Sequence, residues 1–293
     1  MPSWTGKTKG GLLGYQIFVF ILNFFGLAFA YFILRIVAFY YLLFSRKSFK
    51  VIFHYFRTKF KYNVFTAFRK TYQNHFIFGQ TLIDKTVLFS GIKNNFTFHF
   101  DGEHHLRKMA EDKTGGILIS AHMGNWDIAG NFLNKIENNF NVVMYDEEHQ
   151  KIKQYMDNVY KNKKVNIIGI KNDLSHIIKI NLALGDKEFI CIHGDRFIQG
   201  SKTFTKSFLG EDAEFPAGPF SIASKFRVPV AFVYAVKEGN YHYHLFCTPP
   251  KVYESGSAEE IIQDYITNLE SMTRRYPEQW FNYFDFWKKP INS

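Results

Sequence analysis

His122 and Asp127, two residues that can exchange protons, lie five positions apart. They lie where the sequence changes from a strand-like to a helix-like pattern of apolar residues. They belong to the string SAHMGNWDIAG at residues 120–130. The run GGILIS that leads into it has the apolar character of a buried strand, and WDIAGNFLNKI that leads out has the apolar spacing of a helix. A histidine acts as an acid or a base near neutral pH when a partner holds its second ring nitrogen and fixes the tautomer. Asp127 is a candidate for this partner.

The spacing of the two residues limits where each can lie. Residues five apart on a regular helix are separated by about 140° around the axis, so the two side chains would diverge if both were helical. We therefore expect His122 in the strand-to-helix turn, where Gly124 permits the bend, and Asp127 in the first helical turn, from which it reaches back toward the imidazole. The free backbone amides of such a turn offer a site for an oxyanion or a phosphate.

The elements that must position these residues are visible from residue 96 onward, where short apolar runs alternate with longer amphipathic ones. The strand-like runs lie at 96–102, 115–121, 141–147, 165–170, 189–195, 228–237 and 241–253. The helix-like runs lie at 103–113, 126–138, 149–164, 173–187, 217–227 and 258–276. This alternation predicts an α/β fold with a single mixed, mostly parallel sheet flanked by helices. Chemistry gathers at the carboxyl ends of strands in such sheets, and both His122 and Asp195 are expected there.

The N-terminal part of the chain has a different character. Residues 10–34 contain no charged residue, and the apolar sequence resumes after Arg35, so this segment is long enough to cross a bilayer as a helix or to lie in its interface. The heavier group of basic residues follows it, which favours a body on the cytoplasmic side. We expect a membrane anchor at 1–50, a basic amphipathic helical segment at 51–96 and the α/β domain at 97–293. A cleaved signal peptide, with Ala28 and Ala30 at the cleavage site, is the alternative.

The net charge of +10 is unevenly distributed. Residues 1–83 contain eleven Lys and Arg and no acidic residue, which leaves 25 basic and 26 acidic residues in the rest of the chain. Because the excess charge lies beside the most apolar segment, it suits an anionic membrane surface and argues against a nucleic-acid partner. The two cysteines, Cys191 and Cys247, both lie in apolar strand-like runs and are expected to be buried thiols in a reducing compartment.

Four blocks of the sequence resemble one known family. His122 and Asp127 match the H-x4-D/E motif of glycerolipid acyltransferases, and the fuller string AHMGNWD is similar to that of the bacterial lipid A biosynthesis (lauroyl/myristoyl) acyltransferases. GDRF at 194–197, FPAGPFSIASKFRVPVAFVYAV at 215–236 and RRYPEQWFNYFDFW at 274–287 resemble later blocks of the same family in the same order. The N-terminal anchor is also typical of it. The chain has Asp127 where many members have Glu.

The resemblance implies transfer of a fatty acyl chain from an acyl carrier protein or coenzyme A thioester to a hydroxyl of a lipid A-type or other membrane lipid. His122 would be the general base, oriented by Asp127 or, as the less favoured candidate, by Asp195. Arg196 would be a cation for the oxyanion or an acceptor phosphate, and Gly124 and Asn125 would shape the oxyanion site. The family chemistry needs no cofactor or metal beyond the acyl donor. The resemblance also implies a bacterial inner-membrane location with the catalytic domain facing the cytoplasm.

Other interpretations remain open from the residues themselves. His122, Asp127, His193 and Asp195 together could hold a divalent ion in a metal-dependent hydrolase. The same acyl transfer could serve a glycolipid, an amino lipid or a pigment precursor, and the fold could also serve a non-enzymatic membrane adaptor. We expect one of two roles for Phe208, Leu209 and Gly210: they line an acyl channel, or they form a plain surface loop.

Overall fold

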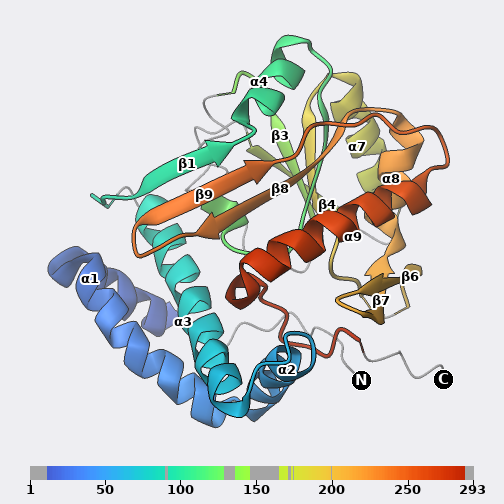
Figure 1. The fold of residues 1–293 in the computed structure, drawn as a ribbon. Helices are drawn as coiled ribbons and strands as arrows, with labels where there is room; N and C mark the ends of the chain where they lie inside the picture. Colours follow the sequence, from blue (N-terminus) through green and yellow to red (C-terminus); the bar gives the residue numbers. More distant parts are fainter. Residues whose placement is uncertain are drawn as a thin grey trace.

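The computed structural model describes residues 12–287, except 90–91, 129–135, 146–164, 171–172, 174 and 199. Within this part of the chain, seven strands form one sheet in the order β1-β9-β8-β2-β5-β3-β4 (Figure 1). The strands are β1 (Thr97–Asp101), β2 (Gly116–Ser120), β3 (Phe140–Tyr145), β4 (Val165–Ile170), β5 (Phe189–His193), β8 (Val230–Lys237) and β9 (His242–Cys247). Neighbouring strands run parallel except β8 and β9, which are antiparallel. The predicted mixed, mostly parallel sheet is therefore confirmed.

Strand β2 lies near the middle of the sheet because its side chains are apolar on both faces. All five of its residues are buried. Ile117 and Ile119 enter the large core cluster that contains the apolar side of α9 (Ala258–Arg275), whereas Leu118 enters a second cluster with Leu106 of α4 (Glu103–Glu111). Two covered faces explain the continuous apolar run GILIS, as expected for a strand of a parallel sheet.

The remaining helices of the α/β part surround this sheet. They are α7 (Ser175–Gly185), which packs on β4 and β5, and α8 (Ala217–Phe226), which packs on α9. A short 3-10 helix, η1 (Pro277–Gln279), follows α9 and brings the chain back to the sheet. The helix expected at 149–164 lies outside the described residues. The helix expected at 126–138 is helical at 126–128 and no longer helical at 136–138, and 129–135 lie outside the description.

One element of the described fold was not expected from the sequence. Strands β6 (Thr203–Phe208) and β7 (Glu211–Pro216) form an antiparallel hairpin whose two turn residues, Leu209 and Gly210, have φ of 51° and 84°. Positive φ at both positions is typical of the tight turn of a two-residue hairpin. Phe208 and Leu209 are buried in the main core, and the Phe208 ring contacts Trp280. Phe208 and Leu209 are therefore core residues and not a plain surface loop, whereas Gly210 is exposed at the turn. The alternative expectation, an acyl channel at these residues, stays a prediction.

Three helices precede the sheet: α1 (Leu12–Phe44), α2 (Arg46–Thr58) and α3 (Val64–Phe89). Figure 1 shows that α3 connects the sheet to α1 and α2, which extend away from it. The main chain of α1 is interrupted at Gly26, where φ is 77° and ψ is 174°. Residues Phe24–Phe44 make one helix that is long and apolar enough to cross a membrane, with 22% of its most apolar stretch buried in the protein.

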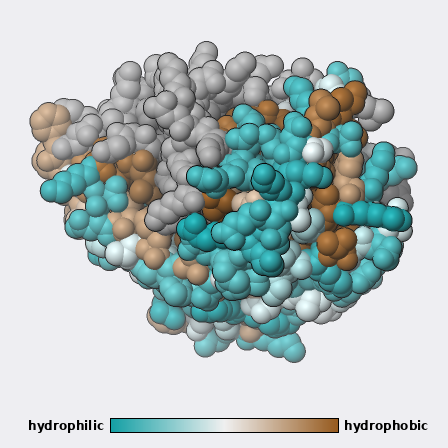
Figure 2. All heavy atoms as spheres, turned by 90° about the horizontal axis from the view of Figure 1, so that it is seen from above, coloured by the Kyte–Doolittle hydropathy of each residue, from teal (hydrophilic) through white to brown (hydrophobic). Residues whose placement is uncertain are grey.

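A strip of large apolar side chains on α1 faces away from the body. More than half of the surface of Phe24, Phe32, Ile36 and Phe44 is exposed, whereas Ala30, Tyr31, Ala38 and Leu42 are buried. Figure 2, which looks down on the α/β body, shows hydrophobic side chains at its left margin, the side on which Figure 1 places α1. A continuous strip of exposed large apolar side chains is typical of a surface that contacts a membrane or another protein.

A buried polar network fixes α1 and α3 to the sheet. Lys237 of β8 lies 2.5 Å from the carboxylate of Asp84 of α3. Tyr31 of α1 and Tyr243 of β9 each donate a hydrogen bond to the same carboxylate. Asp84, Lys237 and both tyrosines are buried, so the charges compensate one another away from water, as buried charges must.

Candidate active site

The pairing of β2 with β5 brings His122 and Asp195 together. The two strands are parallel neighbours, and Ser120 is in register with His193. His122 and Asp195 each follow two residues later, at the carboxyl ends of adjacent strands. Nδ1 of His122 lies 2.8 Å from Oδ1 of Asp195, and the backbone N–H of His122 donates to Oδ2 at 2.9 Å. Both oxygens of one carboxylate therefore hold the same histidine, which fixes its ring and leaves Nε2 for chemistry.

The burial of the pair differs between its two members. The Asp195 side chain is 1% exposed and that of His122 is 25% exposed. The indole Nε1–H of Trp280 donates to Oδ2 of Asp195 at 3.1 Å. Asp195 is thus a covered, fully hydrogen-bonded anion, whereas His122 keeps an open side.

Asp127 does not occupy the place that the sequence predicted. Its Oδ2 lies 2.6 Å from Nζ of Lys85 on α3, and the carboxylate that contacts His122 is that of Asp195. Asp127 is helical, so its side chain leaves the turn toward α3, where a lysine neutralises it. The sequence separation of 42 residues between Lys85 and Asp127 hides this pair from motif spacing.

The turn amides are not free, which differs from the expected oxyanion site. The N–H of Gly124 donates to the carbonyl of Gln279 at 2.8 Å, and that of Asn125 donates to the carbonyl of Ala235 at 2.6 Å. The Asn125 amide nitrogen is buried and donates to the carbonyl of Thr81 at 2.9 Å. Gly124 and Asn125 therefore build the turn and connect it to β8, α3 and η1.

Only glycine fits at position 124. Its φ is 64°, and a Cβ placed there would lie 2.0 Å from the carbonyl oxygen of Ala235. Any side chain would therefore clash with the backbone of β8 and strain a left-handed conformation. The glycine that was expected to permit a bend also allows the turn to lie directly on the sheet.

The surroundings keep His122 in its neutral form. Burial lowers the pKa of His122, the nearby Arg196 lowers it further, and Asp195 opposes both, with a net pKa below the usual value of 6.5. Burial alone would raise the pKa of Asp195, but His122, Arg196 and His193 hold it well below its usual range. At neutral pH the pair is thus a neutral imidazole on a carboxylate, the state that a general base requires.

His193 is a second imidazole beside the first. The ring centroids of His122 and His193 lie 4.4 Å apart, and the edge of Trp126 faces His193 at 5.2 Å. Burial, followed by the influence of His122, lowers the pKa of His193 to about 3. His193 therefore stays uncharged, and its Nδ1 is buried without a hydrogen-bond partner among the described residues.

The segment after α9 covers the base of this site. Arg196 donates from Nη2 to the carbonyl of Phe281 at 2.5 Å, and the N–H of Phe281 donates to the carbonyl of His122 at 2.9 Å. The side chain of Gln279 pairs with both backbone groups of Lys237 at 2.8 Å. The sequence motif PEQW pointed to this segment, but the contact of Trp280 with Asp195 could not be predicted from it.

An apolar pocket lies against His193, whose ring is the neighbour of His122. It is bordered by Ser120, Trp126, Asp127 and His193 on the polar side. Its apolar lining includes Leu106, Leu118, Val142, Val165, Val233 and Leu245. Such a pocket is suited to a hydrocarbon chain whose reactive end faces the imidazoles. Cys191, a half-buried residue whose thiol pKa is raised by burial to about 12, also lines it and is not suited to be a nucleophile.

The four residues of the alternative metal site are only partly brought together. Within the described residues, single ligand atoms of His122, His193 and Asp195 lie within 4.8 Å of one another. Asp127 is paired with Lys85 instead. The remaining three possible ligands are His122, His193 and Asp195, and two of them form the hydrogen-bonded pair described above.

The sequence of the chain matches the model of a known protein family. The model of a family described as "Bacterial lipid A biosynthesis acyltransferase" matches residues 69–289, from within α3 to beyond Trp280. A comparison with curated proteins gives no match. The family match identifies an acyltransferase. It argues against the two alternatives, a metal-dependent hydrolase and a non-enzymatic adaptor. Members of the family are membrane-associated acyltransferases of lipid A biosynthesis, and this chain belongs to the bacterial lipid A biosynthesis acyltransferase family.

Proposed function

We propose that the chain transfers a fatty acyl group from a thioester of acyl carrier protein or coenzyme A to a hydroxyl of a lipid A-type acceptor. The observation that carries the proposal is the neutral His122 whose Nδ1 and backbone amide are both held by Asp195. The family match supplies the reaction class. The strip of apolar residues on α1 supports attachment to a membrane in which the lipid acceptor resides.

The chemistry follows from the atoms present. Nε2 of His122 takes the proton of the acceptor hydroxyl while its oxygen attacks the thioester carbonyl carbon. The tetrahedral intermediate collapses, the carbon–sulfur bond breaks, and the imidazolium returns its proton to the leaving thiolate. Asp195 stabilises the imidazolium during this step. No covalent acyl-enzyme and no cofactor are needed.

Binding of the two substrates can be assigned to separate surfaces. The apolar pocket beside His193 accommodates the acyl chain of the donor. Arg196, close enough to lower the pKa of His122, stabilises negative charge at the reacting carbonyl or on an acceptor phosphate. The basic residues of α2 lie beside α1, where an anionic membrane surface attracts them. We infer from these basic residues that the body lies on the cytoplasmic side of the inner membrane, because positive charge tends to stay on that side.

The test is lipid mass spectrometry of membranes from cells that carry the wild-type protein, His122→Ala or the control His104→Ala. His104 is exposed on α4, outside the site. We expect one lipid class to lose a single acyl chain with His122→Ala and to keep it with His104→Ala, which names acceptor and chain length together. A glycolipid, an amino lipid or a pigment precursor as the affected class would replace the lipid A-type acceptor. Identical profiles for wild type and His122→Ala would refute the proposed base.

A further inference from the structure

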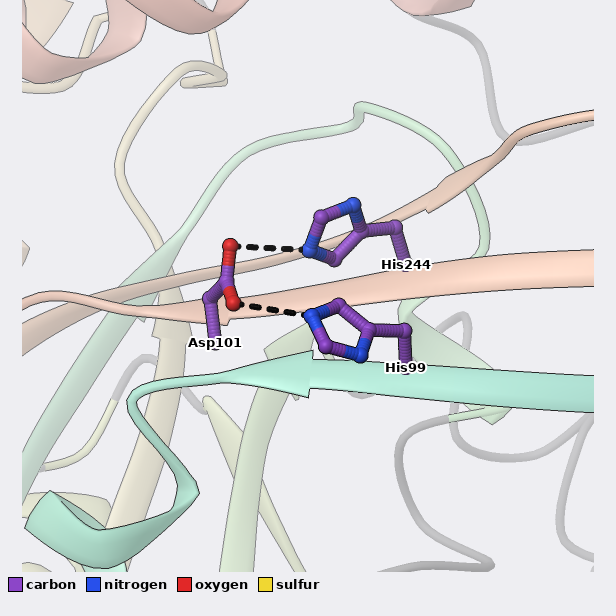
Figure 3. Close-up of side chains that lie close together, drawn as sticks. All are labelled: His99, Asp101 and His244. Carbon is purple, nitrogen blue, oxygen red and sulfur yellow. Dashed lines mark hydrogen bonds and ion pairs between the residues drawn. The ribbon is translucent and has the colours of Figure 1, made fainter.

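A second group of metal-ligating side chains lies on the edge of the sheet, and the acyl-transfer chemistry does not use it. We call His99, Asp101 and His244 the edge cluster. His99 and Asp101 lie on β1, the outermost strand on one side, and His244 lies on the adjacent β9. His99 is in register with His244, and Asp101 follows His99 by two residues, so all three side chains leave the same face of the sheet. Figure 3 shows the Asp101 carboxylate facing both rings, with one oxygen toward each.

The three side chains converge on one point. Nε2 of His99 lies 3.0 Å from Oδ1 of Asp101, and Nε2 of His244 lies 2.9 Å from Oδ2 of the same carboxylate. The three possible ligand atoms all lie within 4.8 Å of one another. Bonds of about 2.0–2.2 Å to Zn²⁺ place the ligand atoms of a tetrahedral site roughly 3.4 Å apart. Small side-chain rotations therefore suffice to seat an ion among them.

The hydrogen bonds of His244 point to a cation in this position. Its Nε2 faces Asp101 at 2.9 Å, and its Nδ1 faces Oε2 of Glu238 at 3.3 Å. A neutral imidazole carries one N–H, so a neutral His244 can donate to only one of these carboxylates. The other nitrogen then turns a lone pair toward a negatively charged oxygen, an arrangement that a positive charge between them relieves.

The wider surroundings match those of a metal-binding histidine. Metal ligands of this type usually donate their second N–H to a carboxylate, which fixes the ring. Glu238 provides that carboxylate for His244 and is itself held by the hydroxyl of Tyr276. The ring of Phe246 packs against His244, with 4.0 Å between centroids. His99 and Asp101 are exposed, which leaves room for water as a fourth ligand.

We propose that the edge cluster binds one Zn²⁺ ion through His99, Asp101 and His244, with Glu238 as the carboxylate that orients His244. Two imidazoles and one carboxylate form a ligand set that Zn²⁺ favours over Mg²⁺ or Ca²⁺. The ion joins edge strand β1 to β9. Through Glu238 and Tyr276 it also stiffens the point at which the chain leaves α9 for η1 and Trp280.

The test is Zn²⁺ binding to the full chain in detergent after treatment with a chelator, measured by calorimetry and by the metal content of the dialysed protein. We expect one ion for the wild type and for the control His242→Ala. His242 lies on the same strand, but its ring contacts Thr97 rather than the edge cluster. His99→Ala and Asp101→Asn, both at exposed positions, are expected to lose this ion, and Glu238→Gln to weaken binding about 10- to 100-fold.

A His122→Ala variant separates the edge cluster from the catalytic histidines, because His122, His193 and Asp195 are the other metal-ligating group in the described chain. The proposal requires that His122→Ala still binds Zn²⁺ and that Zn²⁺ raises the thermal midpoint of this variant but not of His99→Ala. Loss of the ion in His122→Ala with retention in His99→Ala would overturn it. The absence of Zn²⁺ binding by the wild type would also overturn it.

Discussion

At the scale of single residues, the choice between two aspartates decides how His122, the proposed general base, is held. Asp195 contacts both the ring and the backbone of His122, whereas Asp127 forms an ion pair with Lys85. The motif spacing alone favoured Asp127, because sequence shows which residues are near along the chain and not which strands are adjacent in a sheet. The His122–Asp195 contact depends on the β2–β5 pairing, which brings together residues 73 positions apart.

This difference predicts unequal effects of two matched substitutions. Asp195→Asn removes the charge that fixes the tautomer and stabilises the imidazolium, so we expect kcat to fall roughly 1,000- to 10,000-fold. Asp127→Asn removes the ion pair with Lys85, and we expect a smaller loss of kcat together with a lower thermal midpoint. Steady-state kinetics with a thioester donor and a melting curve measure both. A larger loss of kcat for Asp127→Asn would restore Asp127 as the residue that orients the base.

The influence of Arg196 on His122 can be read from a pH profile. Protonated His122 cannot accept the acceptor's proton, so kcat/KM falls as the pH drops through the pKa of His122. Arg196 lowers that pKa. Arg196→Gln removes the cation and should move the acidic limb of the profile to higher pH, whereas Arg196→Lys should leave it nearly in place. An unmoved limb in Arg196→Gln would show that the two groups are not electrostatically coupled.

At the scale of elements, the strands and helices that repeat a simple pattern could be predicted, and the irregular ones could not. The run GILIS predicts β2 because a strand buried on both faces is apolar at every position. The hairpin β6–β7 escaped prediction because its outer positions are polar and charged, as in TFTKSF, and its tight turn has only one glycine. The turn at Gly124 was predicted, but the partners of its amides were not, since these amides bind segments more than a hundred residues away.

The buried network around Asp84 predicts a stability effect for α3 and β8. Lys237→Met leaves the Asp84 carboxylate buried without its cation, and we expect a loss of about 3–5 kcal/mol in the free energy of unfolding. The double variant Asp84→Leu with Lys237→Met removes both charges and should recover much of that loss. Thermal or denaturant melting in detergent measures the pair of effects. Equal stabilities for Lys237→Met and the wild type would contradict a compensated ion pair.

At the scale of the whole molecule, the charge and the apolar surface are both concentrated at one end. The apolar side of α1 and the basic residues of α2 adjoin each other, whereas the α/β body is nearly neutral. The distribution of charged and apolar residues along the sequence predicted this arrangement, because the prediction needs only the order of these residues in the chain. The docking of α1 through Tyr31 onto Asp84 needed the structure.

This asymmetry predicts which surface binds lipid. Phe32→Lys with Ile36→Lys places two charges on the exposed side of α1 and should release the protein from anionic vesicles in a flotation assay. Ile178→Lys with Leu182→Lys makes the same change on α7, where both residues are also exposed, and should not alter binding. Equal release by both pairs of substitutions would show that general hydrophobicity, rather than α1, retains the protein at the membrane.

The contact of Trp280 with Asp195 has a consequence for the order in which the protein matures. Helix α1 is synthesised before the sheet, and the residues that cover the carboxylate and hold the backbone of His122, Trp280 and Phe281, are synthesised after it. A nascent chain can therefore reach the bilayer long before its base is oriented. We therefore expect acyl transfer only from chains that already include Trp280, and no transfer from a chain that stops before it.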